Sequence, residues 1–304
     1  MADINMTDLT RALRHDRAAC IAQAERAYAA HIDGFIDRLL SDGEKRVVLL
    51  AGPSSSGKTT TAAMLRAGLA RRGHAAAVVS LDDFYRAADD PTYPRTPDGA
   101  PDYETVDALH IDDIRACLRT LSEGGEYLLP HFDFRTATRI PQAMPLRLPS
   151  GGYVIMEGLH ALNPRLCEGV PDAHLAKLFV SVSTNLTDGD GVRLLSGRKI
   201  RFLRRLSRDA IYRNSDAANT YRLWQQVLRG EDLYLYPFRD RADAAIDTFH
   251  LYEIGLLRPH AERLLAAPDA PRNAYTTAVA AAMRHFEPIE DAAVPAHSLL
   301  REFI

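Results

Sequence analysis

Residues 52–59 read Gly52-Pro53-Ser54-Ser55-Ser56-Gly57-Lys58-Thr59 and match the phosphate-binding loop pattern G-x-x-x-x-G-K-[ST] in full. The apolar, β-branched run at 46–51 precedes this loop and predicts a buried strand. Residues 59–69 follow it with apolar side chains at helical spacing and predict a helix. Strand, glycine loop and helix therefore come in the order that the pattern requires.

Each part of this loop has a use in binding a nucleoside triphosphate. Loop amides and the positive end of the following helix attract phosphate oxygens. Lys58 adds a positive charge, and the hydroxyl of Thr59 is a ligand for Mg²⁺. We therefore predict that the nucleotide is bound by the residues of the loop and of the first helical turn, which are Gly52, Pro53, Ser54, Ser55, Ser56, Gly57, Lys58, Thr59 and Thr60.

Length and composition limit what the rest of the chain can be. The 304 residues, 46% of them hydrophobic, suffice for one large α/β domain with attachments or for two small domains. A net charge of -3 provides no overall attraction to nucleic acid or to an anionic membrane. No apolar run approaches the ~20 residues of a membrane span, and the polar N-terminal residues predict no signal peptide. Cys20, Cys117 and Cys167 lack metal-binding spacing and predict reduced thiols of a cytoplasmic protein.

Predicted strands and helices alternate along the chain. Apolar runs predict strands at 46–51, 75–81, 153–156, 176–182 and 242–246. Helical spacing predicts one or two helices at 7–41 and further helices at 59–69, 112–121, 198–213, 217–228, 251–265 and 273–286. This order predicts an α/β protein with the P-loop NTPase fold, whose parallel sheet is covered by helices on both faces. We expect an N-terminal helical extension at 1–45, a phosphate-binding domain at 46–268, and a C-terminal helix and tail packed on it at 269–304.

Acidic residues follow two of these strands. Asp82 and Asp83 come after the strand at 75–81, at the edge where open α/β sheets bind ligands. Only one of the two can face the ligand, and we choose Asp82 as a base that takes the proton of an acceptor hydroxyl. Glu157 ends the strand at 153–156, where a carboxylate would bind Mg²⁺. The alternatives are that the aspartates cap the next segment and that Glu157 pairs with Lys58 for structure only.

Arginines crowd one predicted helix, at Arg198, Arg201, Arg204, Arg205, Arg208 and Arg213. Helical spacing puts Arg201, Arg204 or Arg205, and Arg208 on one face, opposite Phe202, Leu203 and Leu206. Next to a triphosphate site, such a face predicts an arginine-rich helical lid that closes over phosphates and stabilises the charge of the transferring phosphoryl group. The alternative is a solvated basic face or one that contacts RNA.

Two further stretches, 102–107 and 130–134, mix carboxylates with aromatic rings. Carboxylates accept hydrogen bonds from sugar hydroxyls, and rings stack on a flat base, so both stretches are candidates for binding an acceptor. Loops that merely pack on a core can have the same composition. His160 follows Glu157 closely and either lines the site or is a satisfied core residue.

As a set, these motifs resemble the uridine/cytidine kinase and phosphoribulokinase family of P-loop kinases. The resemblance is carried by residues 51–60, 81–85, 101–104, 132–134, 157–164, 203–209 and 252–259, and by the tail Leu299-Leu300-Arg301-Glu302-Phe303-Ile304. It runs from about residue 46 to the end, so that 46–268 is expected to be a P-loop kinase domain. It looks closest to a bacterial branch that is fused behind a TGS domain and a threonyl-tRNA-synthetase-like segment. No TGS domain is expected here, and residues 1–45 look like a short helical remnant of the fused region.

The resemblance implies roles for the donor side of the site. Asp82 is the general base, and Thr59 and Glu157 serve Mg²⁺, together with Asp82. Arg205, Arg208 and Arg213 form the lid over the phosphates. The predicted catalytic residues are thus Asp82, Lys58, Arg205 and Arg208, and Arg213 joins the nucleotide-binding residues.

The resemblance also implies an acceptor side. Glu104 holds ribose hydroxyls beside Tyr103, and Phe134 stacks on the base. The predicted acceptor-binding residues are Asp82, Tyr85, Tyr103, Glu104, Phe132, Phe134 and Arg205. A tyrosine and a histidine that read the pyrimidine edge in better-known uridine kinases correspond here to Phe132 and Ala137, so that a hydroxyl donor and an imidazole are missing.

The leading hypothesis is an enzyme that phosphorylates the 5′-hydroxyl of a pyrimidine nucleoside with ATP and Mg²⁺ as cofactors. One alternative keeps this chemistry and changes the acceptor to another small hydroxyl compound, such as a sugar or sugar phosphate. An alternative from another class is an RNA- or ribosome-associated NTPase, although the chain lacks the N-K-x-D and LSGGQ signatures. We expect a small-molecule acceptor, no membrane or nucleic-acid partner and a cytoplasmic location, and we leave a homo-oligomer open.

Overall fold

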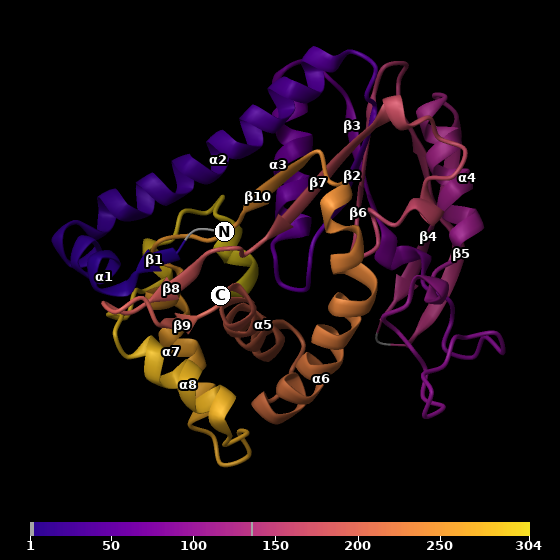
Figure 1. Ribbon diagram of the computed structural model, residues 1–304. Helices are drawn as coiled ribbons and strands as arrows, with labels where there is room; N and C mark the ends of the chain where they lie inside the picture. The colour runs from indigo at the N-terminus through magenta and orange to yellow at the C-terminus, as the bar shows by residue number, and fades with distance from the viewer. Residues whose placement is uncertain (1–2, 135) are drawn as a thin grey trace.

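A five-stranded parallel sheet forms the centre of the protein (Figure 1), as seen in a computed structural model that describes residues 3–134 and 136–304. Its strand order is β10-β7-β2-β6-β3, with the strand before the phosphate-binding loop in the middle. The strands are β2 (Val47–Ala51), β3 (Ala76–Ser80), β6 (Tyr153–Glu157), β7 (Leu175–Ser181) and β10 (Ala244–Asp247). Each lies at a predicted apolar run, so the predicted α/β fold with a parallel sheet is confirmed.

Helices cover both faces of this sheet because neighbouring side chains of each strand point to opposite faces. Val48 and Leu50 belong to one hydrophobic core, and Val47 and Leu49 belong to the other. The second core is covered by α4 (Ile111–Ser122). The first core is covered by α1 (Met6–His15), α2 (Arg17–Asp42), α3 (Lys58–Arg71), α5 (Gly197–Tyr212), α6 (Ala217–Gly230), α7 (Glu253–Leu265) and α8 (Ala274–Met283). Among the described residues, every helix is too short or too polar to span a lipid bilayer.

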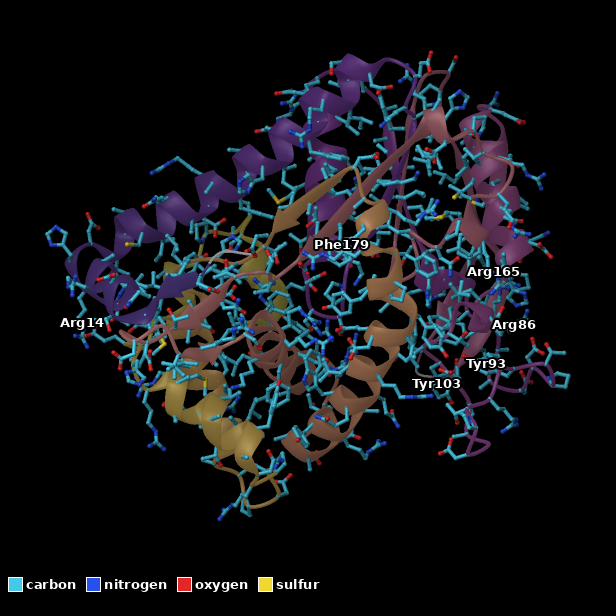
Figure 2. The ribbon with its side chains drawn as sticks, viewed as in Figure 1. Arg14, Arg86, Tyr93, Tyr103, Arg165 and Phe179 are labelled. Carbon is cyan, nitrogen blue, oxygen red and sulfur yellow. The ribbon has the colours of Figure 1, made fainter. Side chains whose placement is uncertain are left out.

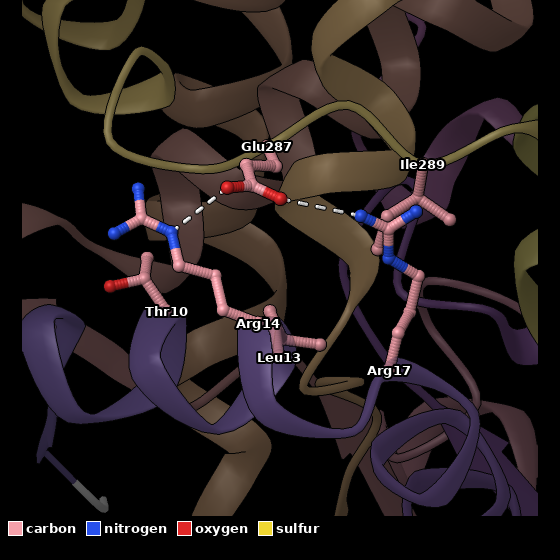
Figure 3. Close-up of a pocket in the computed structure, with 6 residues that line it drawn as sticks. All are labelled: Thr10, Leu13, Arg14, Arg17, Glu287 and Ile289. Atoms are coloured by element: carbon pink, nitrogen blue, oxygen red, sulfur yellow. Dashed lines mark hydrogen bonds and ion pairs between the residues drawn. The ribbon is translucent and has the colours of Figure 1, made fainter.

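Both N-terminal helices pack on the rest of the protein. The predicted helical stretch at 7–41 is two helices, divided at Asp16, whose carboxylate caps α2. Ile36 of α2 is fully buried against Gly68 of α3. At the far end, Arg14 and Arg17 bracket Glu287 across a small pocket (Figure 3), which ties α1 to the segment that follows α8. The division into an N-terminal helical extension at 1–45, a kinase domain at 46–268 and a C-terminal helix and tail at 269–304 stays a prediction.

The structure also contains strands that the sequence pattern did not predict. An antiparallel hairpin consists of β4 (Glu126–Asp133) and β5 (Thr138–Arg147), and it lies at the end of the protein opposite a small sheet (Figure 1). The pairing shifts register around Pro130, and β5 is an exposed edge strand with two prolines. Proline normally argues against a strand, and an edge strand is where it is tolerated. The small sheet consists of β1 (Asp3–Asn5), β8 (Asn185–Thr187) and β9 (Arg193–Leu195), which are too short for a periodic pattern.

Replacing Ile36 by alanine tests how far α2 is part of the folded core. Because the side chain is fully buried between α2 and α3, Ile36→Ala is expected to lower the free energy of unfolding by about 2–5 kcal/mol. Urea unfolding measures this change. Arg38→Ala, at an exposed position of the same helix, serves as the control and should change it by less than about 0.5 kcal/mol. A loss from Ile36→Ala no greater than that of the control would mean that α2 contributes little to stability.

Candidate functional site

The phosphate-binding loop joins the end of β2 to the start of α3. Gly52 has no room for a side chain, since an added Cβ would lie 2.2 Å from the carbonyl oxygen of Val180. Ser55 and Gly57 have left-handed backbone conformations, with φ of 57° and 85°. Such alternation of conformation turns backbone amides towards the space above a helix N-terminus, where an anion binds.

The polar atoms of the loop fit a phosphate group. In the described part of the chain, the hydroxyls of Ser55 and Ser56 are buried without a hydrogen-bond partner. Such groups are costly to leave unsatisfied, and phosphate oxygens are suitable partners for them. Lys58 donates to the carbonyl of Pro53, 3.1 Å away, and Thr59 is exposed in the first turn of α3. A triphosphate could thus be held by hydroxyls, by amides and by Lys58.

Two buried ion pairs hold the loop on the side that faces the protein core. Arg201 of α5 donates twice to Glu231 at 2.7 Å, and its guanidinium also donates to the carbonyl of Ser54. Glu231 in turn accepts from the amide of Ser54 at 2.9 Å. Both charged side chains are almost completely buried, so each would be an unpaired buried charge without the other.

The second pair joins α5 to α7. Arg204 donates to Glu253 at 2.5 Å, to the carbonyl of Thr248 and, at 3.4 Å, to the carbonyl of Ser55. Both side chains of this pair are fully buried. The alternative of a solvated or RNA-contacting basic face is therefore wrong for Arg201 and Arg204. They brace the phosphate-binding loop from the core, and α5 has buried residues on both of its predicted faces.

The three other predicted arginines gather around Asp209. Arg205, Arg208 and Arg213 all contact its carboxylate, at 3.1, 3.0 and 3.5 Å. Arg205 also donates to the hydroxyl of Ser54 at 2.9 Å, whereas Arg213 is 57% exposed. Burial lowers the pKa of Arg205, and Asp209 opposes that shift. These arginines lie next to the loop, and their role as a lid stays a prediction.

Asp82 and Asp83 lie just after β3, which ends one residue earlier than predicted, in a single turn of 3-10 helix (Leu81–Phe84). Asp83 accepts from the amide of Phe132 and contacts the ring of His131, and thus holds the hairpin. Of the two aspartates, Asp82 is therefore the one that is free of the hairpin and could face a ligand. Surrounding protein displaces part of its water and raises the pKa of Asp82, although its side chain is still exposed; Lys58 opposes the shift.

Glu157 ends β6, beside the end of β3. Its carboxylate accepts from the hydroxyl of Ser80 at 3.0 Å and is buried. Burial raises the pKa of Glu157, Lys58 lowers it, and Asp82 raises it further, so both charges act within electrostatic reach of Glu157. In the described part of the chain, no three His, Cys, Asp or Glu side chains are grouped closely enough to hold a metal ion alone. Mg²⁺ at phosphates needs only one or two protein carboxylates, and Thr59 and Glu157 could supply oxygen ligands.

Glu104 lies against the end of α6. Gly230 makes this approach possible, since a Cβ there would lie 2.5 Å from the Cβ of Glu104. Burial raises the pKa of Glu104 to about 7; Glu231 adds to the shift, and Arg205 opposes it. The predicted acceptor carboxylate therefore lies within reach of the charges of Arg205 and Asp82, which the sequence separates by 123 residues.

The predicted acceptor-binding rings form two groups. The rings of Phe132 and Phe134 are 4.8 Å apart, and that of Tyr85 packs on both. Phe134 is 62% exposed and Phe132 is buried. The rings of Tyr93 and Tyr103 lie together at the end of the protein that carries the hairpin (Figure 2), 5.5 Å apart. Tyr85, Phe132 and Phe134 are thus brought together, and the hydroxyl of Tyr85 donates to the carbonyl of Tyr103 at 3.1 Å.

Some functional residues had no signal in the sequence. Glu231, which holds the amide of Ser54, follows Gly230 in a π-helical turn, and nothing in its neighbourhood marks it as buried. His160 is buried, and burial lowers its pKa to about 4. Both of its ring nitrogens lack a hydrogen-bond partner in the described residues, so its burial alone does not make it the satisfied core residue of the second alternative.

Two depressions lie away from this site. The pocket of Figure 3, between α1 and the segment around Ile289, has an accessible volume of only about 10 Å³. A polar depression of about 350 Å³, lined by Arg46 and Arg147 among others, lies at the edge where β2 and β6 begin. Open α/β sheets bind ligands at the opposite edge, where the loop, Asp82 and Glu157 lie.

The fold and this site define a P-loop α/β protein. The sequence profile of the phosphoribulokinase/uridine kinase family matches residues 47–254, which is more than half of the chain. The protein therefore belongs to the phosphoribulokinase/uridine kinase family, as the sequence motifs predicted.

Individual relatives are distant. A uridine kinase of Saccharomyces cerevisiae is 24% identical over 201 residues, which are 66% of this chain and 36% of that protein. A uridine kinase of Leuconostoc citreum is 28% identical over 163 residues, 54% of this chain and 68% of that one. A solved structure described as a possible uridine kinase from Bacillus stearothermophilus superposes with a TM-score of 0.44 at 19% identity, over 70% of this chain and 98% of that one. The matched segment spans only about a third of the yeast protein and of similar relatives from plants and fission yeast.

The raised pKa of Glu104 predicts a pH-dependent stability. The folded state favours the protonated carboxyl, so this stabilisation is complete below pH 4.5 and is lost as the pH rises through about 7. Glu104→Gln stays neutral and is expected to exceed the wild type in free energy of unfolding by about 1–3 kcal/mol near pH 8, with no difference near pH 4.5. Urea unfolding across this range measures it, with the exposed Glu44→Gln as control. If Glu104→Gln is instead less stable than the wild type near pH 8, the ionised carboxylate of Glu104 stabilises the fold through its attraction to Arg205.

The buried ion pair of Arg201 and Glu231 predicts that a change of one partner alone strongly lowers the free energy of unfolding. Glu231→Gln leaves Arg201 as an unpaired buried charge and should lower the free energy of unfolding by about 3–5 kcal/mol. The double change Arg201→Met with Glu231→Leu removes both charges and should recover much of that loss. Asp232→Asn, which breaks an exposed pair with Arg198, is the matched control and should cost less than about 1 kcal/mol. A loss for Glu231→Gln similar to that of the control would refute the bracing role.

Proposed function

We propose that the protein transfers the γ-phosphoryl group of ATP, with Mg²⁺, to the 5′-hydroxyl of a pyrimidine nucleoside. The single observation that carries this proposal is that Asp82 follows β3 at the edge of the sheet that carries the phosphate-binding loop, while Arg205 donates to Ser54 of that loop and lies within electrostatic reach of Glu104. A base and a hydroxyl-binding carboxylate beside a phosphate site are what transfer to an alcohol requires. Family membership supports the same chemistry.

In the proposed reaction, the chain's own residues position the two substrates. Loop amides, the hydroxyls of Ser55 and Ser56, and Lys58 hold the phosphates. Asp82 accepts the proton of the attacking hydroxyl as the new O–P bond forms, and its raised pKa brings it nearer to the pH at which it acts. Arg205, Arg208 and Arg213 stabilise the charge of the transferring group. Mg²⁺, when bound at Thr59 and Glu157, supplies charge neutralisation and orients the phosphates.

The surroundings of Glu104 favour a neutral polyhydroxyl acceptor. Glu231, Asp102 and Asp82 all lie within electrostatic reach of Glu104 and raise its pKa, and Asp102 accepts from the hydroxyl of Tyr234 at 3.0 Å. Several carboxylates repel a phosphorylated acceptor, so a sugar phosphate is less suited than a nucleoside or a free sugar. The free sugar remains a second candidate because Phe132 is buried and has no group that could read the edge of a base. Cytoplasmic location and a homo-oligomer stay predictions.

A panel of acceptors tests the proposal. Purified protein with ATP and Mg²⁺ is incubated with uridine, cytidine, free sugars, a sugar phosphate or RNA, and ADP release is measured. We expect a pyrimidine nucleoside to give the greatest stimulation. Stimulation by RNA with none by any nucleoside would contradict the proposal, and stimulation by a sugar alone would select the second candidate.

Asp82→Asn tests the base. With the best acceptor, kcat is expected to fall by about 10²- to 10⁴-fold because the amide cannot take the proton. Asp89→Asn, an exposed aspartate in the loop that follows, is the control with the same change of charge. Full activity of Asp82→Asn would exclude Asp82 as the base.

A further inference from the structure

The C-terminal segment 298–303 is built into the core next to the phosphate-binding loop. Its 3-10 helix (Leu299–Phe303) contacts α3 and α5, and the C-terminus lies beside α5 (Figure 1). Leu299 fills the space beside Gly57, where an added Cβ would lie 2.3 Å from its Cδ1. The guanidinium of Arg204 lies over the ring of Phe303, 5.1 Å from its centre. Leu299, Leu300 and Phe303 are fully buried, so the backbone of this segment is firmly anchored.

Glu302 points from this anchored segment to the nucleotide-binding turn of α3. Its carboxylate accepts a hydrogen bond from the hydroxyl of Thr60 at 2.9 Å. Its charge contributes to the raised pKa of Glu157 and opposes the lowered pKa of Arg213, so it lies within electrostatic reach of both. Across residues 3–134 and 136–304, no Lys, Arg or His nitrogen forms an ion pair with Glu302 within 4.0 Å. The carboxylate is thus a half-buried negative charge held mainly by one hydroxyl.

Thr60 belongs to the predicted nucleotide-binding residues, and a phosphate that it binds would use the same hydroxyl. A threonine hydroxyl has one proton, so Thr60 cannot donate to Glu302 and to a phosphate oxygen at once. The two acceptors are also both anionic, and like charges a few ångströms apart repel each other even near a protein surface. The side chain of Glu302 has three rotatable bonds, so it can leave Thr60 while the buried residues around it stay in place.

We propose that Glu302 is a positioning residue that competes with the nucleotide phosphates for the hydroxyl of Thr60, so that the C-terminal segment sets the affinity of the loop for nucleotide. This inference rests on the proposed nucleotide site and not on the identity of the acceptor. Nucleotide binding exchanges the Thr60–Glu302 hydrogen bond for a Thr60–phosphate hydrogen bond, and the carboxylate turns away.

Direct binding of ADP with Mg²⁺, measured by titration calorimetry without any acceptor, tests the inference. Glu302→Gln and Glu302→Ala are each expected to lower Kd about tenfold, because neither a neutral amide nor a methyl group competes with a phosphate oxygen for the Thr60 hydroxyl as a carboxylate does. Thr60→Val keeps the shape of the side chain and removes the hydroxyl; in that background Glu302→Gln should change Kd by about threefold or less, since the contested proton is absent. Glu290→Gln, an exposed glutamate of the same C-terminal region, removes the same charge and should leave Kd unchanged.

A gain in affinity distinguishes this role from a structural one, because a variant that loosens the segment would bind nucleotide more weakly. Weaker or unchanged binding in both Glu302 variants overturns the inference. An equal gain with and without the Thr60 hydroxyl overturns it too, since charge alone would then explain the effect. If Lys58→Ala binds as well as the wild type, or the wild type binds no nucleotide, the nucleotide site fails together with the inference. A response at Glu302 combined with no stimulation by any nucleoside overturns only the proposed acceptor.

Discussion

The phosphate-binding loop depends on two desolvated ion pairs, Arg201 with Glu231 and Arg204 with Glu253. A glycine-rich loop has little core of its own, and its carbonyls and amides need partners once they leave the sheet. The guanidiniums of Arg201 and Arg204 donate hydrogen bonds to the carbonyls of Ser54 and Ser55. Glu231 accepts a hydrogen bond from the amide of Ser54. Because a buried charge without its partner is severely destabilising, these contacts cannot be lost one at a time. They fix α5 against the loop, and α6 and α7 with it.

This arrangement explains why donor and acceptor sides of the proposed site meet. α5 presents Arg205 to both the loop and Glu104, and the end of α6 at Gly230 lets Glu104 approach. The parallel sheet brings Asp82 and Glu157 to the same edge as the loop, because the carboxyl ends of parallel strands lie together. The C-terminal segment adds a third contribution, since Leu299 and Phe303 pack against Gly57 and Arg204. Residues from the whole length of the chain thus converge on one short loop.

Much of this could be predicted from the sequence, and the exceptions have physical causes. Apolar runs located all five strands of the central sheet: β2, β6 and β7 are buried on both faces and so must be largely apolar, and the partly buried edge strands β3 and β10 still carry short apolar runs. The hairpin of β4 and β5 escaped notice because it is an exposed edge around Pro130, where hydrophobic alternation is weak. Arg201 and Arg204 were predicted on the face of a lid, with a basic surface as the alternative, because composition shows a charge but not the buried carboxylate that neutralises it. Their partners lie 30 and 49 residues away, beyond any local pattern.

By itself, the sequence of 52–59 determined that this protein has a phosphate-binding loop between a strand and a helix, because that geometry is local and needs glycine at defined positions. The rest of the sequence located Asp82 and Glu157 after their strands, and the carboxyl ends of parallel strands lie at the same edge of the sheet as the loop. Only the tertiary structure decided that Arg201 and Arg204 brace the loop from the core, that Arg205 contacts the hydroxyl of Ser54, and that Glu302 contacts Thr60. Those assignments depend on long-range packing, in which one helical turn separates a buried ion pair from a side chain that faces the loop.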